Sequence, residues 1–490
     1  MSGTPIGRVV IVGGGTAGWM AAAAASRFLN DGQRTITLIE SDAIGTVGVG
    51  EATIPPIRSF NARLGIDEAD FLRATGGTPK LGIEFVDWGA VGERYMHPFG
   101  TPGRDIEGLN FHQLWLKLRD RPGIGDFEGY AMAAVAARAG RFAPPAPDPR
   151  SPLSGVDYAY HFDAGLYAAF LRRRAEDQGT VRVEGRIIGV EQDERGHVGA
   201  VRLEGDRQIA GDLFLDCSGF RSLLLGETMG VGFEDWSHWL PCDRAIAVPT
   251  ERTQPLLPYT RATAHAAGWQ WRIPLQHRTG NGYVYASGFT DDAEAERVLM
   301  ANLDAVPTAA PRRLSFTAGR RRQSWAGNVV ALGLAGGFLE PLESTSIHLI
   351  QEGISKLFAL FPDNRFSPIE RDEYNRLMGD HYAAIRDFII LHYAATRRDD
   401  TPFWRHVRTM ALPDTLAHKI ALFREKGRIF RYDDELFTVP SWVAVLLGQG
   451  IVPSGYDPVV DALDADRVAE ALRHMRRQNA ALAQQLPLAG

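Results

Sequence analysis

A glutamate followed by three small hydroxyl residues marks the segment EPLESTSIHL, residues 340–349. Glu343 stands where an apolar stretch gives way to apolar residues spaced three or four apart, which predicts a helix that begins near Thr345. A carboxylate and hydroxyl groups at a helix start are most simply explained as a helix cap. Whether capping is the whole role of Glu343 depends on which other reactive side chains the chain carries.

Lysine is the second residue type of interest because it is rare in this chain. Only five of the 53 basic residues are lysines, and one of them, Lys80, lies in PKLGIEF at residues 79–85. An arginine side chain stays protonated in proteins, whereas a buried lysine can lose its charge. Lys80 is therefore consistent with a role that needs an uncharged amine, and the alternative is a surface lysine after a proline turn.

A nucleotide-binding signature opens the chain. RVVIV predicts a short buried strand, and the glycines Gly13, Gly15 and Gly18 follow it at the start of an alanine-rich helix. The segment RTITLIE predicts a second strand that ends at Glu40, at the spacing expected for an acid that binds ribose hydroxyls. Such a turn lets a pyrophosphate approach the amides at the helix start. The combination predicts a dinucleotide site.

Two later segments predict further strands of the same sheet. Residues 181–219 contain a strand, a β-hairpin and a buried strand, and residues 327–341 add an apolar strand. Strands from widely separated segments that join one sheet are typical of FAD-binding folds, whereas simple NAD dehydrogenases usually complete their nucleotide site in one contiguous block. The pattern therefore favours FAD over NAD. We therefore expect an α/β, FAD-binding monooxygenase-like (Rossmann-type) fold with an interleaved substrate-binding part and a helical C-terminal region. The expected FAD-binding module comprises residues 1–90, 156–226 and 324–365, and the substrate-binding module 91–155, 227–323 and 366–490.

The helical C-terminal expectation comes from apolar periodicity over residues 374–430 and 463–485. The proline-rich stretch 141–155 predicts an exposed connection. No long uncharged apolar run or charged leader is present, and the formal charge of −6 gives no sign of a nucleic-acid or membrane partner. With only two cysteines, Cys217 and Cys242, we expect a reduced, soluble, cytoplasmic protein without a metal site.

Five segments stand out along the chain: GGGTAGW at 13–19, VGVGEATIP at 47–55, PKLGIEF at 79–85, GWQWRIP at 268–274 and EPLESTSIHL at 340–349. Together they resemble the flavin-dependent tryptophan halogenases, and the resemblance runs over nearly the whole chain. It implies the FAD-binding fold and a reaction in which reduced flavin, O2 and chloride or bromide give hypohalous acid, which halogenates an electron-rich aromatic such as an indole.

The resemblance also implies roles for individual residues. Lys80 is expected beside the substrate, to polarise the halogen oxidant or to form a chloramine, and Glu343 to orient Lys80 or to take the ring proton. The amides of Thr345 and Ser346 are expected to hold the halide, although the family usually has glycine where this chain has Ser346. The other expected contacts are FAD at Gly13, Gly15, Thr16, Ala17, Gly18, Glu40, Gly50, Ala52 and Gly333, the substrate at His97 and Phe99, and the family motif Trp269, Trp271, Ile273 and Pro274.

By the same resemblance, the bulky Trp-x-Trp residues keep the organic substrate away from the flavin. We expect a separate NAD(P)H-dependent flavin reductase to supply reduced FAD, because the sequence carries no second nucleotide signature. Tryptophan-specific members of the family carry a Tyr- and Trp-rich segment near the C-terminus that covers the bound amino acid, and the comparable residues 423–453 lack a clear Tyr-Tyr pair. The comparison with the family therefore implies an indole-like or larger aromatic substrate in place of free tryptophan, with bromide preferred. The chain is expected to be a monomer or homodimer. The alternatives are a flavin-dependent aromatic hydroxylase and a non-catalytic flavoprotein that binds an aromatic ligand.

Overall fold

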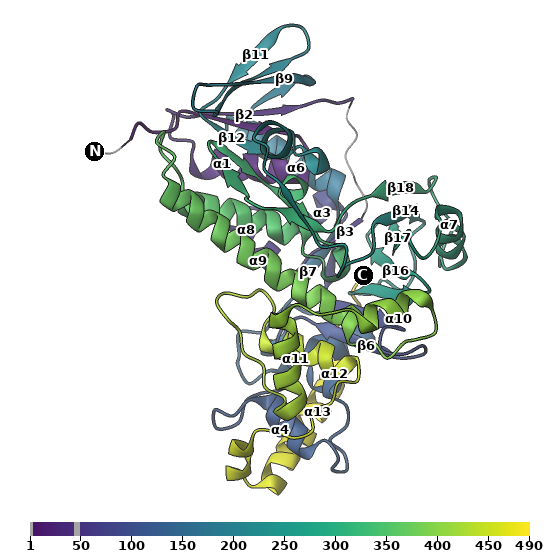
Figure 1. Ribbon diagram of the computed structural model, residues 1–490. Coiled ribbons are helices and arrows are strands. Elements are labelled where there is room, and N and C mark those ends of the chain that lie inside the picture. Colours follow the sequence, from purple (N-terminus) through teal and green to yellow (C-terminus); the bar gives the residue numbers. More distant parts are fainter. Residues whose placement is uncertain (1–2, 44–49) are drawn as a thin grey trace.

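The predicted nucleotide-binding strands lie side by side in one sheet. The structure, a computed structural model, describes residues 3–43 and 50–490 (Figure 1), so the first part of the VGVGEATIP segment lies outside the described residues. The sheet has the order β20-β21-β12-β1-β2-β8, and every neighbouring pair is parallel except β20 with β21. Its strands are β1 Arg8–Val12, β2 Thr35–Glu40, β8 Val181–Glu184, β12 Leu213–Asp216, β20 Trp325–Ala326 and β21 Val329–Ala331.

The order of this sheet confirms the predicted fold class, since strands distant in sequence return to β1. Helix α1, Thr16–Phe28, packs against α6, Ala164–Asp177, and α8, Ser346–Ala359. The alanines from Ala21 to Ala25 are buried and give α1 a smooth surface for these contacts. The predicted hairpin forms an antiparallel sheet at one end of the molecule (Figure 1) from β9 Ile187–Gln192, β10 Val198–Leu203 and β11 Arg207–Ala210.

A seven-stranded sheet carries the Trp-x-Trp segment on its central strand. Its order among the described residues is β18-β14-β17-β16-β15-β5-β6, and only the β15–β5 pair is parallel. The strands are β5 Gly82–Val86, β6 Arg94–Pro98, β14 Arg244–Thr250, β15 Thr260–His265, β16 Gly268–Pro274, β17 Thr279–Tyr285 and β18 Arg312–Ser315.

A small sheet joins the two larger ones. Strand β7, Ala159–Asp163, pairs with β3, Gly50–Ala52, on one side and with β4, Thr78–Lys80, on the other. Strand β3 also contacts β16 and β17. Strand β7 thus lies between β3 and the strand that ends at Lys80. Another short sheet contains β13 Phe233–Asp235, β19 Gly319–Arg321 and β22 Gly337–Phe338.

The carboxy-terminal part is helical, as its periodicity predicts, and gathers at the end opposite β9 and β11 (Figure 1). None of the helices in the described part of the chain is long and apolar enough to cross a membrane. The remaining helices are α2 Pro56–Arg63, α3 Glu68–Thr75, α4 Phe111–Leu118, α5 Met132–Arg138, α7 Asp292–Ala301, α9 Pro368–Ala394, α10 Pro402–Thr409, α11 Asp414–Lys426, α12 Val439–Gly448 and α13 Ala465–Gln485. Single turns are η1 Phe127–Tyr130, η2 Pro152–Gly155, η3 Gly219–Arg221, η4 Leu223–Thr228, η5 Gly333–Ala335, η6 Pro341–Glu343 and η7 Pro458–Ala462.

Asp216, at the end of β12, organises the loop that follows. It is fully buried, and its Oδ2 accepts hydrogen bonds from the amides of Leu224 and Leu225 at 2.9 and 2.8 Å. Its Oδ1 accepts from the amide and the hydroxyl of Ser218. One carboxylate therefore accepts hydrogen bonds from four donors in the loop that follows the sheet.

Replacing Asp216 with alanine should lower the free energy of unfolding by about 3–5 kcal/mol, because it leaves buried donors without a partner. Chemical denaturation of the purified protein measures the change. Asp177→Ala, at an exposed position of α6, is the matched control and should leave stability unchanged. Equal stability of the two variants would contradict the assigned role of Asp216.

Candidate active site

A cavity of about 590 Å³ opens beside the amino-terminal end of α1. This volume is typical of a ligand or cofactor pocket. Every predicted cofactor contact except Gly18 lines it, namely Gly13, Gly15, Thr16, Ala17, Glu40, Gly50, Ala52 and Gly333.

The glycine turn has the shape that a pyrophosphate requires. Gly13 has a φ of 111°, and a Cβ there would lie 2.3 Å from the carbonyl oxygen of Cys217. No atom lies within 4 Å of a Cβ built on Gly15, so the helix start is open on that side. Gly18 acts differently, because its Cβ would lie 1.8 Å from the Gly13 carbonyl oxygen. Gly18 permits close packing of the turn and does not line the cavity.

The predicted ribose-binding acid is held in place at the cavity wall. The Glu40 carboxylate accepts hydrogen bonds from Arg182 Nε at 2.5 Å and from Trp19 Nε1 at 3.3 Å. The start of α1 has no side-chain cap, since its N-cap residue is Gly15. Uncapped amides and a positioned acid together fit an FAD molecule, with the amides at its pyrophosphate and Glu40 at a ribose.

The Trp-x-Trp segment forms part of the cavity wall. Trp271 and Ile273 line the cavity, whereas Trp269 is buried behind it. Trp269 Nε1 donates a hydrogen bond to Glu340 Oε2 at 2.7 Å, and the Tyr393 hydroxyl donates to the same oxygen at 2.6 Å. The strand is therefore tied to the segment that carries Glu343.

Glu340 is a carboxyl group that burial keeps close to neutral. Burial raises its pKa to about 7, although the hydrogen bonds from Tyr393 and Trp269 act in the opposite direction. Its other oxygen, Oε1, has no hydrogen-bond partner among the described residues. Near neutral pH, a large share of this carboxyl group is therefore protonated.

Lys80 is completely buried, next to the cavity but not on its wall. Its Nζ donates hydrogen bonds to the Thr53 carbonyl oxygen at 2.9 Å and to Ser344 Oγ at 2.8 Å. Ser344 itself lines the cavity, so it connects the amine to that space. Burial lowers the pKa of Lys80 to about 7, and the negative charge of Glu343 opposes this shift. Near neutral pH, a large share of the amine is therefore uncharged.

Glu343 lies between two imidazoles. His97 Nδ1 is 2.9 Å from Oε2, and His392 Nε2 is 2.7 Å from Oε1. Burial alone would raise the pKa of Glu343, but the two histidines outweigh it and lower the pKa to about 2. The carboxylate is thus an anion that both histidines stabilise.

Aromatic side chains surround this group on the side of β6. The Phe99 ring lies 5.1 Å from Lys80 Nζ, and the His97 ring lies 5.6 Å from Phe388 and 6.2 Å from Phe437. The predicted substrate residues His97 and Phe99 are both buried here. The structure therefore brings Lys80, Glu343, His97 and Phe99 together.

The sequence predicts that hydroxyl side chains cap the helix that follows Glu343, and the structure shows no such cap. Helix α8 begins at Ser346 with Thr345 as its N-cap residue, and no side chain caps it. Thr345 has right-handed helical angles, and Ser344, at a φ of 59°, bonds to Lys80. The capping prediction is wrong for this reason. The uncapped helix start has Ser346 on the cavity wall, and its ordinary helical backbone accommodates a side chain where the family usually has glycine.

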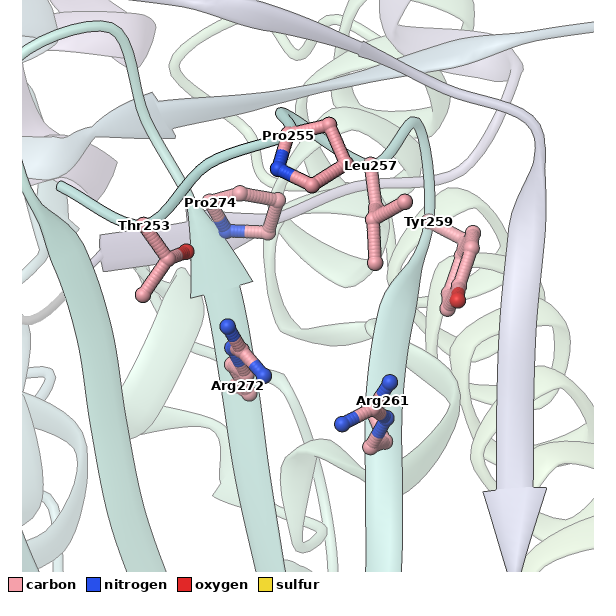
Figure 2. Close-up of a pocket in the computed structure, with 7 residues that line it drawn as sticks. All are labelled: Thr253, Pro255, Leu257, Tyr259, Arg261, Arg272 and Pro274. Carbon is pink, nitrogen blue, oxygen red and sulfur yellow. The ribbon is translucent and has the colours of Figure 1, made fainter. Parts of the chain in front are cut away.

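A second cavity, of about 10 Å³, lies between strands β15 and β16 (Figure 2). Its lining includes Arg261 and Arg272, which face each other across the two strands, and Pro274, the last residue of the Trp-x-Trp segment. This space holds about one water molecule and is too small for an aromatic ring. Pro274 thus faces away from the large cavity, unlike Trp271.

Sequence reasoning missed several residues of the site. His392 is on α9, and Thr53 contributes only a carbonyl oxygen. His392 lies in none of the five segments, and Thr53 lies in VGVGEATIP but acts through its backbone, which residue type does not reveal. Ser344 is inside EPLESTSIHL, but its bond to Lys80 depends on its left-handed backbone.

The chain is similar to known proteins along most of its length. A family model described as tryptophan halogenase matches residues 8–465. Tryptophan 6-halogenase SttH of Streptomyces toxytricini is 37% identical, over 96% of this chain and 95% of its own. The structure of Xcc4156, a flavin-dependent halogenase from Xanthomonas campestris, is 50% identical with a TM-score of 0.95, covering 99% of this chain and 97% of that one. BrvH, a flavin-dependent halogenase from Brevundimonas sp. BAL3, is 48% identical with a TM-score of 0.96, covering 99% and 98%.

The raised pKa of Glu340 predicts a pH-dependent stability. The protonated acid stabilises the fold below the ordinary glutamate pKa, and this contribution is lost as the pH rises through about 7. Glu340→Gln removes the titration, so its unfolding free energy should fall less than that of the unsubstituted protein between about pH 5 and about pH 8. Denaturation at several pH values measures both slopes. Glu194→Gln, at an exposed turn, is the control, and a Glu340→Gln slope equal to that of the control would show that Glu340 is ionised in the folded protein.

Proposed function

The chain belongs to the tryptophan halogenase family and is a flavin-dependent halogenase, and on this basis we propose that it halogenates indole-like aromatics with the residues described above. The family uses FAD and a halide, acts on a small aromatic substrate and relies on a separate flavin reductase. Reduced FAD, when bound, supplies the chemistry by which O2 oxidises a halide to hypohalous acid. The observation that carries the proposal is the Lys80 amine, which is buried next to the cavity and whose pKa burial lowers to about 7.

The protein's first task is to separate two chambers. Trp271 and Ile273 stand on the wall of the large cavity, and the bond from Trp269 to Glu340 fixes the strand that carries them. We propose that the substrate ring binds on the other side of this wall, near Lys80 and out of reach of the flavin, and that the small oxidant reaches Lys80 by way of Ser344, which lines the cavity and bonds to the amine. This arrangement favours halogenation over the direct oxygen transfer of a hydroxylase.

Halide binding is assigned to the helix start at Thr345 and Ser346. The lack of a side-chain cap at α8 leaves its amides available, and a helix start favours an anion by roughly 0.3–1 kcal/mol. The buried Thr345 Oγ1 has no partner among the described residues and is a further donor at this place. Such a weak site suits a substrate anion that must react and leave.

Lys80 and Glu343 are assigned to halogen transfer. An uncharged Lys80 amine has the lone pair needed to take up halogen, and its charged form donates a hydrogen bond that polarises the oxidant. The anionic Glu343 beside it draws off the proton that the ring loses. The rings of Phe99, Phe388 and Phe437 lie close to Lys80 Nζ and His97, so the surroundings of these groups are aromatic, which suits an electron-rich ring.

The proposed substrate is an indole-like or larger aromatic and not free tryptophan, with bromide preferred to chloride. The two structures with about one half identity are described only as flavin-dependent halogenases, whereas the 37% identical relative is a tryptophan 6-halogenase. The FAD module is proposed at residues 1–90, 156–226 and 324–365 and the substrate module at 91–155, 227–323 and 366–490. An NAD(P)H-dependent reductase delivers the reduced FAD to a monomer or homodimer.

A panel of indoles and phenols tests this function. With FAD, a reductase, NADH, O2 and equal chloride and bromide, mass spectrometry should detect brominated indoles by their isotope doublet. Free tryptophan should give less product than indole. Oxygenated products independent of halide would support a hydroxylase instead, and exclusive chlorination would contradict the bromide preference.

Two substitutions test the residue roles. Lys80→Ala should abolish halogenation, and Glu343→Gln should lower its rate by about 10²–10⁴-fold, because each removes a group that acts on the substrate. FAD fluorescence titration should give unchanged affinity, since neither residue lines the cavity. Lys356→Ala, on the distant part of α8, is the matched lysine control. Full turnover by Lys80→Ala would refute the assignment.

A further inference from the structure

The Lys80 amine and the Glu343 carboxylate are buried close together, yet they do not form a direct pair. Both hydrogen bonds of Lys80 go to neutral acceptors, the Thr53 carbonyl and the Ser344 hydroxyl. No contact within 4.0 Å joins Lys80 to Glu343 among the described ion pairs, in which Glu343 meets only His97 and His392. A direct contact with the carboxylate would favour the charged form of the amine. The separation of the two groups therefore bears on the charge of Lys80 and needs a structural cause.

His392 is the better-anchored of the two imidazoles. It is fully buried on α9, and its ring stacks on Phe85 with centroids 4.5 Å apart. Its Nδ1 lies 3.1 Å from the Tyr95 hydroxyl, and Gln449 Nε2 donates to the His392 carbonyl oxygen at 2.9 Å. Both the ring and the backbone are thus fixed from strand β6 and from the end of α12.

The hydrogen-bond partners of His392 determine which of its ring nitrogens carries the proton. With the Tyr95 hydroxyl donating to Nδ1, the proton of a neutral imidazole is on Nε2, which faces Glu343. Nε2 lies 2.7 Å from Oε1, although the N–H is not aligned on the oxygen as in an ideal hydrogen bond. The contact is short and joins a rigidly held imidazole to the carboxylate.

An uncharged amine is what halogen uptake requires. The lone pair of a neutral amine attacks the halogen of hypohalous acid, an N–X bond forms, the X–O bond breaks, and the leaving hydroxide takes the amine proton to become water. The ring then displaces halogen from nitrogen and loses its own proton, which restores the amine. An ammonium group has no lone pair for the first step, so a direct ion pair with Glu343 would slow it.

We propose that His392 is a positioning residue that holds the Glu343 carboxylate off the Lys80 amine and thereby keeps that amine uncharged enough to take up halogen. The inference rests on the proposed function of Lys80 in halogen transfer. Nothing in the family motifs signals this residue, because it acts through Glu343 and not on the substrate.

The charged and titratable neighbours support this direction. The anion of Glu343 raises the pKa of Lys80, and burial lowers it more strongly. His161 on β7 stays neutral, because burial and the nearby Lys80 hold its pKa well below the usual value. His97 on β6 is the other partner of Glu343, and Tyr95 has a pKa raised by burial and by Glu343. A shift of Glu343 toward Lys80 is thus the change that would charge the amine.

The chain is well suited to a direct measurement, because Lys80 is one of only five lysines. Protein carrying [15Nζ]lysine is titrated by NMR without flavin, and Lys80→Ala assigns the signal. In His392→Leu, which cannot donate to Glu343, the Lys80 titration should move upward by about 1–3 pH units. In His392→Gln, whose amide can donate in place of Nε2, the titration should stay near that of the unsubstituted protein.

The same shift has a consequence for turnover. A rise of one unit from about 7 reduces the uncharged fraction at pH 7 from about one half to about one tenth. Halogenation by His392→Leu at pH 7 should therefore fall at least about fivefold and recover at higher pH. A merely structural defect would lower the rate equally at every pH.

A control variant separates this effect from general damage to the fold. His112 on α4 is also a buried histidine, with its Nε2 bonded to the Gly427 carbonyl oxygen. His112→Leu should leave the Lys80 titration unchanged, even if it lowers thermal stability. Thermal melting of all variants shows whether each is folded under the NMR conditions.

The outcomes distinguish the inference from the proposed function. An unmoved Lys80 titration in folded His392→Leu overturns the inference, and an equal shift in His392→Gln shows that the loss of donation is not its cause. If the unsubstituted protein halogenates no aromatic of the panel, the proposed function fails, while the titration still reports whether His392 controls the charge of Lys80.

Discussion

The carboxylate of Glu343 has to remain an anion in a place from which water is excluded. Burial opposes this, and the two imidazoles of His97 and His392 make it possible. The same two contacts occupy both carboxylate oxygens, which leaves the neighbouring Lys80 with neutral hydrogen-bond partners. The charge of the Lys80 amine therefore depends on whether the Glu343 carboxylate contacts the two histidines or the amine. Charges interact much more strongly in a buried site than in water, so this choice of partner has a large effect.

The fold meets this requirement by bringing distant segments against one another. Strand β4 supplies Lys80, β6 supplies His97, η6 supplies Glu343 and α9 supplies His392. Strand β7 pairs with both β4 and β3, and β3 borders the large cavity, so Lys80 is held close to that cavity without lining it. Because the paired strands form a rigid unit, the amine stays close to the cavity and is still separate from it.

The strand that lines the large cavity is tied to a second buried acid. Glu340 bonds to Trp269 of β16 and to Tyr393 of α9, and burial raises its pKa, in contrast to Glu343 three residues later. The difference lies in the partners. Glu340 meets only neutral donors, whereas Glu343 meets two imidazoles that can carry charge.

The sequence by itself determined the fold class, the glycine turn, the late returns to the sheet and the helical end, because strand and helix periodicity and glycine spacing are local properties. The resemblance in five segments also brought Lys80, Glu343, His97 and Phe99 into one expected site, where the structure finds them together. Only the tertiary structure decided the partners of Glu343, since His392 joins the site through helix packing and no motif marks it. It also replaced the predicted hydroxyl cap with a bond from Lys80 to Ser344, because a backbone angle at residue 344 redirects that side chain. The spacing of apolar residues indicates which face of a helix or strand is buried. It does not indicate which distant element packs against that face, because this depends on the tertiary arrangement.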